Sequence, residues 1–315
     1  MGDLITDTLS GELSYFKRNN FLKIKKSMIN DETKASLISD MQRINILYMI
    51  SKAGSGHIGT SFSSIDIMTW LYFFHMKKND IFFSSKGHDS PAVYNSLIVR
   101  GDIKEENIHH LRKIDGLPGH PDTNTPGIIT NTGSLGMGIS KAKGMILADR
   151  AKGIKRYYYV LLGDGELQEG QIWESLVSAV NNEFKELVVI VDNNKIQSDK
   201  FVKDTSNLLN LKNKFISFGW KVKKINGNNF NSLRKTFTKN FLDSKKPKII
   251  IADTIKGYGA KNMDHRNVMK EYKYYPFHSG APSKENYDIA NNEILKRIKQ
   301  NINQCKDKNL SINIT

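Results

Sequence analysis

Cysteine is almost absent from this chain of 315 residues, whose single example is Cys305 near the C-terminus. One cysteine can build neither a disulfide framework nor a thiolate metal site, and such usage is typical of a reducing compartment. We therefore expect a cytoplasmic protein. Long apolar runs are also lacking, and none approaches the length of a membrane span. No secretory signal is evident, so we expect neither a secreted nor a membrane protein.

Acidic residues are too few to balance the basic ones, and the formal net charge is +15. Nucleic-acid binding would require basic residues that cluster with a recognised binding module. The lysines are instead spread along the chain, and no such module is present. We interpret the charge as a solvated surface that also attracts anionic, phosphorylated substrates. No nucleic-acid partner is expected.

The most informative stretch contains two apolar runs, each followed by polar residues. Residues 157–162 have the length of a buried strand and lead into Gly163-Asp164-Gly165. Apolar positions at helical spacing follow over 171–182, and a second buried strand over 187–191 leads to Asp192-Asn193-Asn194. This pattern predicts a βαβ unit with parallel strands. Because parallel strands end at the same edge of a sheet, Asp164 and Asn194 should lie about one strand spacing apart.

An acid and an amide at that edge would form an oxygen-rich site. Carboxylate and amide oxygens suit magnesium or calcium, held together with the phosphates of a substrate or cofactor. A Gly-Asp-Gly turn alone would indicate no more than an ordinary βαβ unit. The second polar cluster, at this spacing and after a buried strand, favours a functional site over that simpler interpretation.

Helix and strand patterns alternate along the rest of the chain. We expect helices over 31–52, 63–74, 92–99, 108–114, 139–149, 229–242 and 291–300, and strands over 81–83, 219–225 and 248–253. This alternation predicts an α/β fold, with a doubly wound, mostly parallel sheet and helices on both faces. We divide the chain into an N-terminal extension with a little helix (1–30), a single domain (31–300) and a C-terminal tail (301–315).

Four of the eight histidines lie in loops that contain glycine or proline, namely His57, His88, His120 and His278. The glycines around His57 predict an exposed imidazole in a loop. Taken singly, each of the four is more often a surface or turn residue than a catalyst. A further loop, residues 131–138, places three glycines at a helix start, where free N–H groups can bind a polar ligand.

Taken in order, the loops resemble one known family. They read SGHIG, KGHDS, LPGHPD, TGSLGMG, GDGELQEG, DNNKIQ, KGYG and HSGAP. The GDG and DNN pair is similar to the thiamine-diphosphate fingerprint, and the whole series resembles the N-terminal domain of transketolase over roughly residues 35 to 285. The resemblance implies a thiamine-diphosphate-binding fold and the transfer of a two-carbon ketol unit between sugar phosphates or related sugars.

The resemblance also implies which residues hold the cofactor. Three oxygens would bind a magnesium or calcium ion: those of Asp164, Asn194 and the carbonyl of Ile196. The diphosphate contacts would be Gly165, His88 and His278. The residues along the cofactor, with backbone groups at its aminopyrimidine, would be Gly133, Ser134 and Leu135. Ser134 stands where long-chain relatives often have proline, and HSGAP carries an extra residue.

Four residues are implied near the substrate. His57, His120 and His278 would face the sugar hydroxyls and carbonyl, where an imidazole with a pKa near 6.5 can move protons or donate hydrogen bonds. Glu169, in GDGELQEG, would lie near the cofactor and the contact between subunits. Ile172 and Trp173, just after it, are candidates for an apolar partner-facing surface.

The family's long chain continues with a pyrimidine-binding domain and a C-terminal domain, which are not represented here after about residue 285. The resemblance therefore implies the N-terminal subunit of a split transketolase, assembled with a separate C-terminal subunit, two copies of each. One alternative is the α subunit of a 2-oxo-acid dehydrogenase or decarboxylase, which shares the GDG and Asn signals but not the SGH, GHP and HSGAP loops. Another is a homologue that binds a partner without catalysis.

Overall fold

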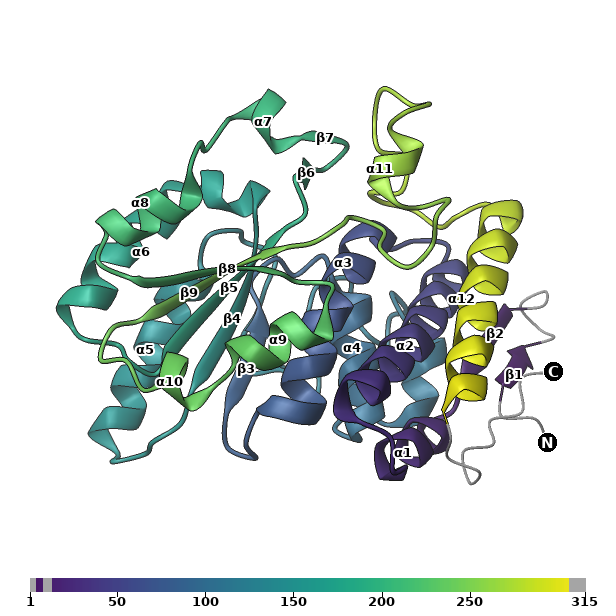
Figure 1. Cartoon of the computed structure of the whole chain (residues 1–315), viewed down its shortest axis with the longest axis horizontal. Helices are drawn as coiled ribbons and strands as arrows, with labels where there is room; N and C mark the ends of the chain where they lie inside the picture. The colour runs from purple at the N-terminus through teal and green to yellow at the C-terminus, as the bar shows by residue number, and fades with distance from the viewer. Residues whose placement is uncertain (1–3, 8–12, 306–315) are drawn as a thin grey trace.

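A parallel β-sheet forms the centre of the protein in the computed structural model, which describes residues 4–7 and 13–305 (Figure 1). Its strand order is β3-β4-β5-β9-β8. The strands are β3 (Ile81–Ser84), β4 (Tyr158–Gly163), β5 (Leu187–Asn193), β8 (Lys221–Asn226) and β9 (Lys248–Asp253). All neighbouring pairs are parallel, so that the carboxyl ends of the five strands lie at one edge.

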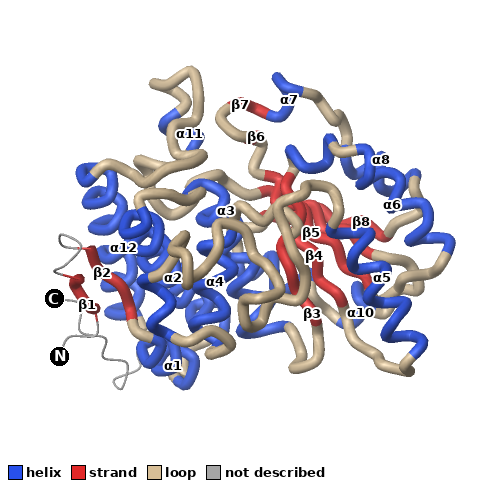
Figure 2. The backbone as a smooth tube through the Cα atoms, turned by 180° about the vertical axis from the view of Figure 1, so that it is seen from behind, coloured by secondary structure: helices blue, strands red, loops and turns tan. Residues whose placement is uncertain are grey.

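Helices cover both faces of the sheet (Figure 2). Alternate residues of each central strand face opposite sides, and two separate apolar clusters result. The first cluster includes α2 (Asp31–Ala53), α3 (Ile58–Trp70), α4 (Ser90–Arg100), α9 (Phe230–Thr236), α10 (Lys239–Leu242) and α12 (Lys284–Gln304). The second includes α5 (Gly138–Ala151), α6 (Gly170–Asn181) and α8 (Leu211–Ser217). The predicted α/β fold, a doubly wound parallel sheet with helices on both faces, is confirmed.

Short elements stand at the carboxyl edge of the sheet. They are β6 (Ile196–Gln197), β7 (Lys200–Phe201), α7 (Val202–Thr205) and α11 (His265–Val268). The N–H of Tyr275 donates to the carbonyl of Asp199 at 2.8 Å, and the side chains of Ile196, Val268 and Tyr275 pack together. Two segments far apart in sequence therefore meet above the strand ends (Figure 1).

Several predicted helices have different bounds in the structure. The helix expected over 63–74 begins five residues earlier, at Ile58, so that His57 directly precedes it. The helix expected over 108–114 is wrong: a 3-10 turn (Glu105–His109) is followed by an isolated bridge between Leu111 and Leu117. The helix over 229–242 is divided into α9 and α10, and the last helix begins at Lys284 rather than at residue 291.

The N-terminal segment is not a detached arm over the residues described. Strands β1 (Leu4–Asp7) and β2 (Leu13–Phe16) pair antiparallel, and α1 (Arg18–Lys26) follows. Phe16 and Phe21 are each 1% exposed and belong to the first apolar cluster. The division into 1–30, 31–300 and 301–315 stays a prediction, and residues 306–315 of the predicted tail lie outside the described part. Within the described part, no helix is both long and apolar enough to cross a membrane.

Candidate cofactor and substrate site

The turn after β4 and the loop after β5 meet at the carboxyl edge, as predicted. Asp164 follows β4 directly, and Asn194 follows β5 directly. Oδ2 of Asp164 accepts a 2.5 Å hydrogen bond from the N–H of Lys195, and its Oδ1 accepts one of 2.8 Å from Gly165. Oδ1 of Asn194 accepts from the N–H of Ile196 at 3.0 Å. Asp164, Asn194 and Ile196 are therefore held in one compact loop structure.

Asp164 carries a perturbed carboxyl group. It is only 4% exposed, and its burial, followed by the nearby negative charge of Asp192, raises its pKa to about 6. The two N–H groups act against this shift but do not cancel it. A buried carboxylate of this kind gains from a bound cation, because the cation compensates its lost hydration.

The candidate ion ligands are of mixed type. Within the described residues, no group of three or more His, Cys, Asp and Glu side chains is placed to hold a metal ion. The predicted set combines one carboxylate, one amide and one main-chain carbonyl, from Asp164, Asn194 and Ile196. All three are oxygen donors, which magnesium and calcium prefer. Every residue of this set is less than a tenth exposed.

Three of the four predicted histidines form a cluster beside this loop. The ring centroid of His57 lies 5.3 Å from that of His88 and 5.1 Å from that of His278. His88 and His278 are 6.1 Å apart. His57 is half-buried rather than exposed, since it leads directly into the buried helix α3. The structure thus brings His278 together with two imidazoles from the first hundred residues of the chain.

His120 lies at the open side of the cluster. It is exposed, and its Cδ2 lies 3.0 Å from the place where a Cβ on Gly87 would stand. Gly87 has φ 71°, and a side chain there would also meet the N–H of Gly133 at 2.8 Å. A glycine is therefore needed at position 87, because the loops of His88, His120 and Gly133 approach one another closely there.

The clustered histidines are held neutral near pH 7. Burial, followed by the neighbouring His278 and Arg112, lowers the pKa of His57 to about 4. Burial and the ammonium of Lys256 lower the pKa of His278 to about 4. The pKa of His88 is lowered well below its usual value by burial and by Lys86. A neutral imidazole offers one N–H donor and one acceptor nitrogen, which suits contacts to sugar hydroxyls.

Lys256 is a site residue that the sequence reasoning missed. It follows β9, is 2% exposed, and its Nζ donates to the carbonyls of Ser198 at 2.8 Å and Ile196 at 3.3 Å. Nδ1 of His278 lies 3.4 Å from the same ammonium. Burial lowers the pKa of Lys256 to about 8, although the charge of Asp164 opposes the shift. The KGYG motif contained this residue, but nothing in its spacing predicted a contact with the loop after β5.

Arg112 is a second residue that was missed. Its guanidinium lowers the pKa of both His57 and His120, after burial, and its Nη1 donates to Oγ of Ser55 at 2.8 Å. Its backbone has φ 56°, a left-handed conformation that is uncommon for a residue with a side chain. Such conformations cluster at functional sites. Because a helix was expected over 108–114, the sequence did not indicate that Arg112 lies in a loop beside the histidines.

The two glutamates of the GDGELQEG motif have different environments. Glu169 is exposed, and a Cβ on Gly136 would lie 2.7 Å from its Cβ. Glu166 is 3% exposed. Its carboxylate accepts from Ser85 Oγ at 2.5 Å and from the N–H groups of Gly136 at 2.9 Å and Gly163 at 3.0 Å. Glu166 therefore joins three loops of the site, a role that the sequence reasoning did not assign.

The predicted partner-facing residues need correction. Ile172 is fully buried in the second apolar cluster. Trp173 is half-buried, stacks on Phe215 with ring centroids 5.6 Å apart, and donates to the carbonyl of Leu167. The apolar residue that α6 does expose is Val177, at 48%. The helix is rotated so that position 177, rather than 172 or 173, faces outward.

Exposed apolar side chains also occur on α5 and in the TGSLGMG loop. Leu147 of α5 is 52% exposed and Leu135 is 38% exposed. Gly133 and Ser134 are exposed as well. The loop expected along the cofactor is therefore uncovered on this side, next to two helices that contact each other.

Comparison with known proteins gives a consistent result. Residues 34–272 match the sequence profile of the family described as transketolase, thiamine diphosphate binding domain. One subunit of an apulose-4-phosphate transketolase from Phocaeicola vulgatus is 33% identical over 274 residues, covering 84% of this chain and 95% of that protein. One subunit of a 6-deoxy-6-sulfo-D-fructose transketolase from Clostridium sp. is 36% identical over 222 residues, covering 67% of this chain and 81% of that protein.

Solved structures agree at the level of the fold. Transketolase from Campylobacter jejuni superposes with a TM-score of 0.71 at 23% identity, over 90% of this chain and 50% of that one. Transketolase from Leishmania mexicana gives a TM-score of 0.71 at 25% identity, over 87% of this chain and 45% of that one. The chain therefore spans about half the length of these transketolases.

Proposed function

Because the chain belongs to the transketolase family through its thiamine-diphosphate-binding domain, we propose that it is the cofactor-binding subunit of a two-chain transketolase. The observation that carries the proposal is the meeting of Asp164, Asn194 and the Ile196 carbonyl with three imidazoles at one sheet edge. The family matches favour this function over the α subunit of a 2-oxo-acid dehydrogenase or decarboxylase. The enzyme would transfer a two-carbon ketol unit from a ketose donor to an aldose acceptor.

The donor set fits thiamine diphosphate held through a divalent ion. Two buried polar atoms of the site have no hydrogen-bond partner among the described residues, namely Nδ1 of His57 and Oε1 of Gln197. Such atoms are costly unless a ligand or water satisfies them. Gln197 contacts the Gly165 turn, and His57 lies in the histidine cluster. Both atoms are thus available to a polar molecule that fills the site.

Each proposed ligand has a definite task in this arrangement. Asp164, Asn194 and the Ile196 carbonyl would hold magnesium or calcium, and His88, His278 and Gly165 would contact the diphosphate. Backbone groups of Gly133, Ser134 and Leu135 would contact the aminopyrimidine. When bound, the cofactor supplies an electron sink for carbon–carbon cleavage.

The substrate would lie over the exposed side of the histidine cluster. His57, His120 and His278 would donate hydrogen bonds to sugar oxygens and accept protons from them. We propose an anionic sugar, because relatives are named for a sugar phosphate and a sulfo-sugar and because Arg112 adds an exposed cation beside His120. A net charge of +15 would steer such substrates towards the protein.

The partner would be a second chain that supplies the pyrimidine-binding and C-terminal domains. The complete enzyme would contain two copies of each chain and would work in the cytoplasm. Relatives that are named as one subunit of a transketolase support a two-chain enzyme. Glu169 and the exposed apolar residues Leu135, Leu147 and Val177 would form the contact. Covering them would also close the uncovered side of the cofactor loop.

The test is to purify the chain alone and together with its partner chain. Alone, it should bind thiamine diphosphate in a magnesium-dependent way, measured by calorimetry, yet show no ketol transfer from a ketose donor to an aldose acceptor. Activity should require both chains. Full activity of the single chain would contradict the two-chain proposal, and failure of both preparations to bind the cofactor would favour a non-catalytic homologue.

A further inference from the structure

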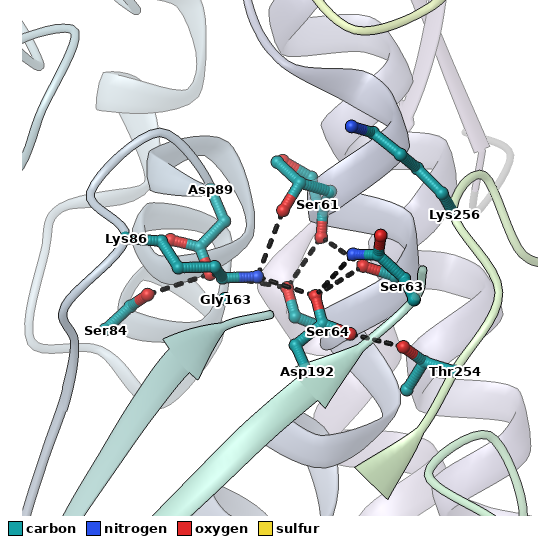
Figure 3. A network of polar contacts seen from close by, with 12 residues as sticks. Ser61, Ser63, Ser64, Ser84, Lys86, Asp89, Gly163, Asp192, Thr254 and Lys256 are labelled. Carbon is teal, nitrogen blue, oxygen red and sulfur yellow. Dashed lines mark hydrogen bonds and ion pairs between the residues drawn. The ribbon is translucent and has the colours of Figure 1, made fainter. Parts of the chain in front are cut away.

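A buried charged network around Asp192 and Lys86 lies next to the proposed ligand Asn194 (Figure 3). Its centre is Asp192, in β5, which is fully buried. Oδ2 of Asp192 accepts from Nζ of Lys86 at 2.7 Å and from Oγ of Ser63 at 2.7 Å, and Oδ1 accepts from Oγ1 of Thr254. These donors come from the ends of β3 and β9 and from α3, so that the carboxylate joins three other segments.

Asp192 also contacts a proposed ion ligand. Nδ2 of Asn194 donates to Oδ2 of Asp192 at 3.2 Å, while Oδ1 of Asn194 accepts from the N–H of Ile196 at 3.0 Å. The carboxylate can only accept, so this contact fixes the amide with its nitrogen turned inward. The oxygen keeps a second lone pair for a cation. An amide with the opposite orientation would present N–H groups to the ion.

Lys86 holds the carboxylate of Asp192 in place. Its Nζ lies 2.7 Å from Oδ2 of Asp192, and neither side chain is more than 1% exposed. Lys86 is 1% exposed, and its Nζ also contacts Asp89 Oδ2 at 3.3 Å and Thr60 Oγ1 at 3.0 Å. It cannot leave this place without depriving two buried carboxylates of the cation beside them.

The same lysine reaches the other half of the site through its backbone. Nδ1 of His88 donates to the carbonyl oxygen of Lys86 at 3.0 Å. This bond fixes the tautomer of His88 and leaves its Nε2 free for a ligand. Lys86 therefore helps to orient two residues: His88, through the main-chain carbonyl, and Asn194, through Asp192.

We propose that Asp192 and Lys86 are positioning residues, which hold Asn194 and His88 in the orientation that binds the metal ion and the diphosphate. The proposal rests on the cofactor assignment above. Removal of a group that hydrogen-bonds to a metal ligand and orients it typically weakens metal affinity by about 10–100-fold. Removal of a buried ion pair with a purely structural role would lower folding stability but would not change the affinity for the cofactor.

The chain contains a matched control for that structural role. Arg43 and Asp66 form another buried ion pair, with an N–O distance of 2.6 Å and each side chain 1% exposed. Asp66 contacts none of the proposed ligands; its other partner is Asn228, at 2.9 Å. Asp66→Leu and Asp192→Leu therefore remove the same group from comparable surroundings, and only the second lies behind the ion site.

The experiment measures the affinity of the full chain for thiamine diphosphate at saturating magnesium by calorimetry, together with the thermal unfolding midpoint without ligand. Asp192→Leu should weaken binding by about 10–100-fold, whereas Asp66→Leu should lower the unfolding midpoint and leave affinity unchanged. Asp192→Asn keeps an acceptor for Asn194 and should lie between Asp192→Leu and the wild type. Equal affinity for the wild type and the Asp192 variants would overturn the proposal.

A double-mutant cycle covers the case in which Asp192→Leu does not fold. If Asp192 acts through Asn194, then Asp192→Asn should lower affinity in the wild-type background and have no further effect in Asn194→Ala. An equal loss in both backgrounds would contradict the inference. A wild-type chain that fails to bind the cofactor would instead refute the proposed function itself, so that the two failures are distinguishable.

Discussion

The backbone N–H of Lys195 donates a 2.5 Å hydrogen bond to Oδ2 of Asp164, and this bond joins the loops that follow β5 and β4. Lys195 stands between the two proposed ion ligands Asn194 and Ile196. It has φ 73°, in the left-handed region that favours glycine. The loop therefore keeps an uncommon backbone conformation, which turns its N–H towards the carboxylate.

Asp164→Ala should abolish the magnesium dependence of thiamine diphosphate binding. The change removes the one charged ligand of the proposed set and the acceptor for Lys195. Calorimetric titrations with and without magnesium measure the effect. Asp253→Asn is a suitable control, because Asp253 ends the neighbouring strand β9 and its side chain contacts Asn193 and the ammonium groups of Lys195 and Lys224, none of which is a proposed ligand. Unchanged metal dependence in Asp164→Ala would refute the ligand assignment.

Cofactor binding should weaken as the pH falls through 6. The pKa of Asp164 is raised from 3.8 to about 6, so that protons compete with the ion below that pH. The same shift stabilises the fold without ligand at low pH, and this contribution is lost as the pH rises through 6. One unit below the pKa, affinity should fall about tenfold. Thermal unfolding with and without magnesium and cofactor, at pH 5 and 7, should show a larger ligand-induced increase at pH 7.

Asp164→Ala gives the control for this pH dependence. The variant should lose the part of the pH dependence that the carboxyl group causes, while contributions from the cofactor's own phosphates remain. An identical pH profile in the variant and the wild type would show that another group is responsible.

His120→Ala and His88→Ala should separate catalysis from cofactor binding. His120 is exposed at the open side of the cluster, whereas His88 is half-buried and bonded to the Lys86 carbonyl. Loss of one proton-transfer or oxyanion contact should lower kcat about a hundredfold in His120→Ala, with near-normal cofactor affinity. His88→Ala should instead weaken the affinity for the cofactor. Steady-state kinetics of the assembled enzyme measure kcat, and calorimetry measures the cofactor affinity. Weakened cofactor binding in His120→Ala together with a lowered kcat but normal affinity in His88→Ala would show that the two assignments must be exchanged.

Val177→Asp should disrupt assembly with the partner chain without unfolding the protein. Val177 is 48% exposed on α6, the helix that begins just after Glu169, and it belongs to the proposed contact. A buried charge at such a contact is costly. Ile216→Asp is the matched control, because Ile216 is 49% exposed on α8. Size-exclusion chromatography of the two co-expressed chains should show loss of the complex only for Val177→Asp. Equal behaviour of the two variants would place the contact elsewhere.

The sequence was sufficient to predict those parts of the site that follow neighbouring strands. A buried strand, a crossover helix and a second buried strand impose parallel pairing, and parallel pairing places Asp164 and Asn194 at the same edge. The glycine-flanked histidines could be assigned to one site only through the family resemblance. Their ring distances of 5.1 to 6.1 Å are set by loops that no local pattern describes.

Other features were decided by tertiary structure. Arg112 takes a left-handed conformation in place of the expected helix, and α6 is rotated so that Ile172 packs inside while Val177 faces outward. Both depend on which neighbours fill the space around a segment, and an apolar residue at helical spacing fits either a core or a contact surface.

The sequence by itself determined the parallel α/β architecture and the placement of Asp164 and Asn194 at one sheet edge, because periodicity and strand connection act locally along the chain. It indicated the family through the ordered series of loop motifs. Only the tertiary structure decided that Lys256 reaches the Ile196 carbonyl and that Lys86 supports Asp192 beneath Asn194. These contacts join residues 60 and 106 positions apart. A charged side chain can be buried there only because segments brought together by the folded sheet supply all of its partners at once.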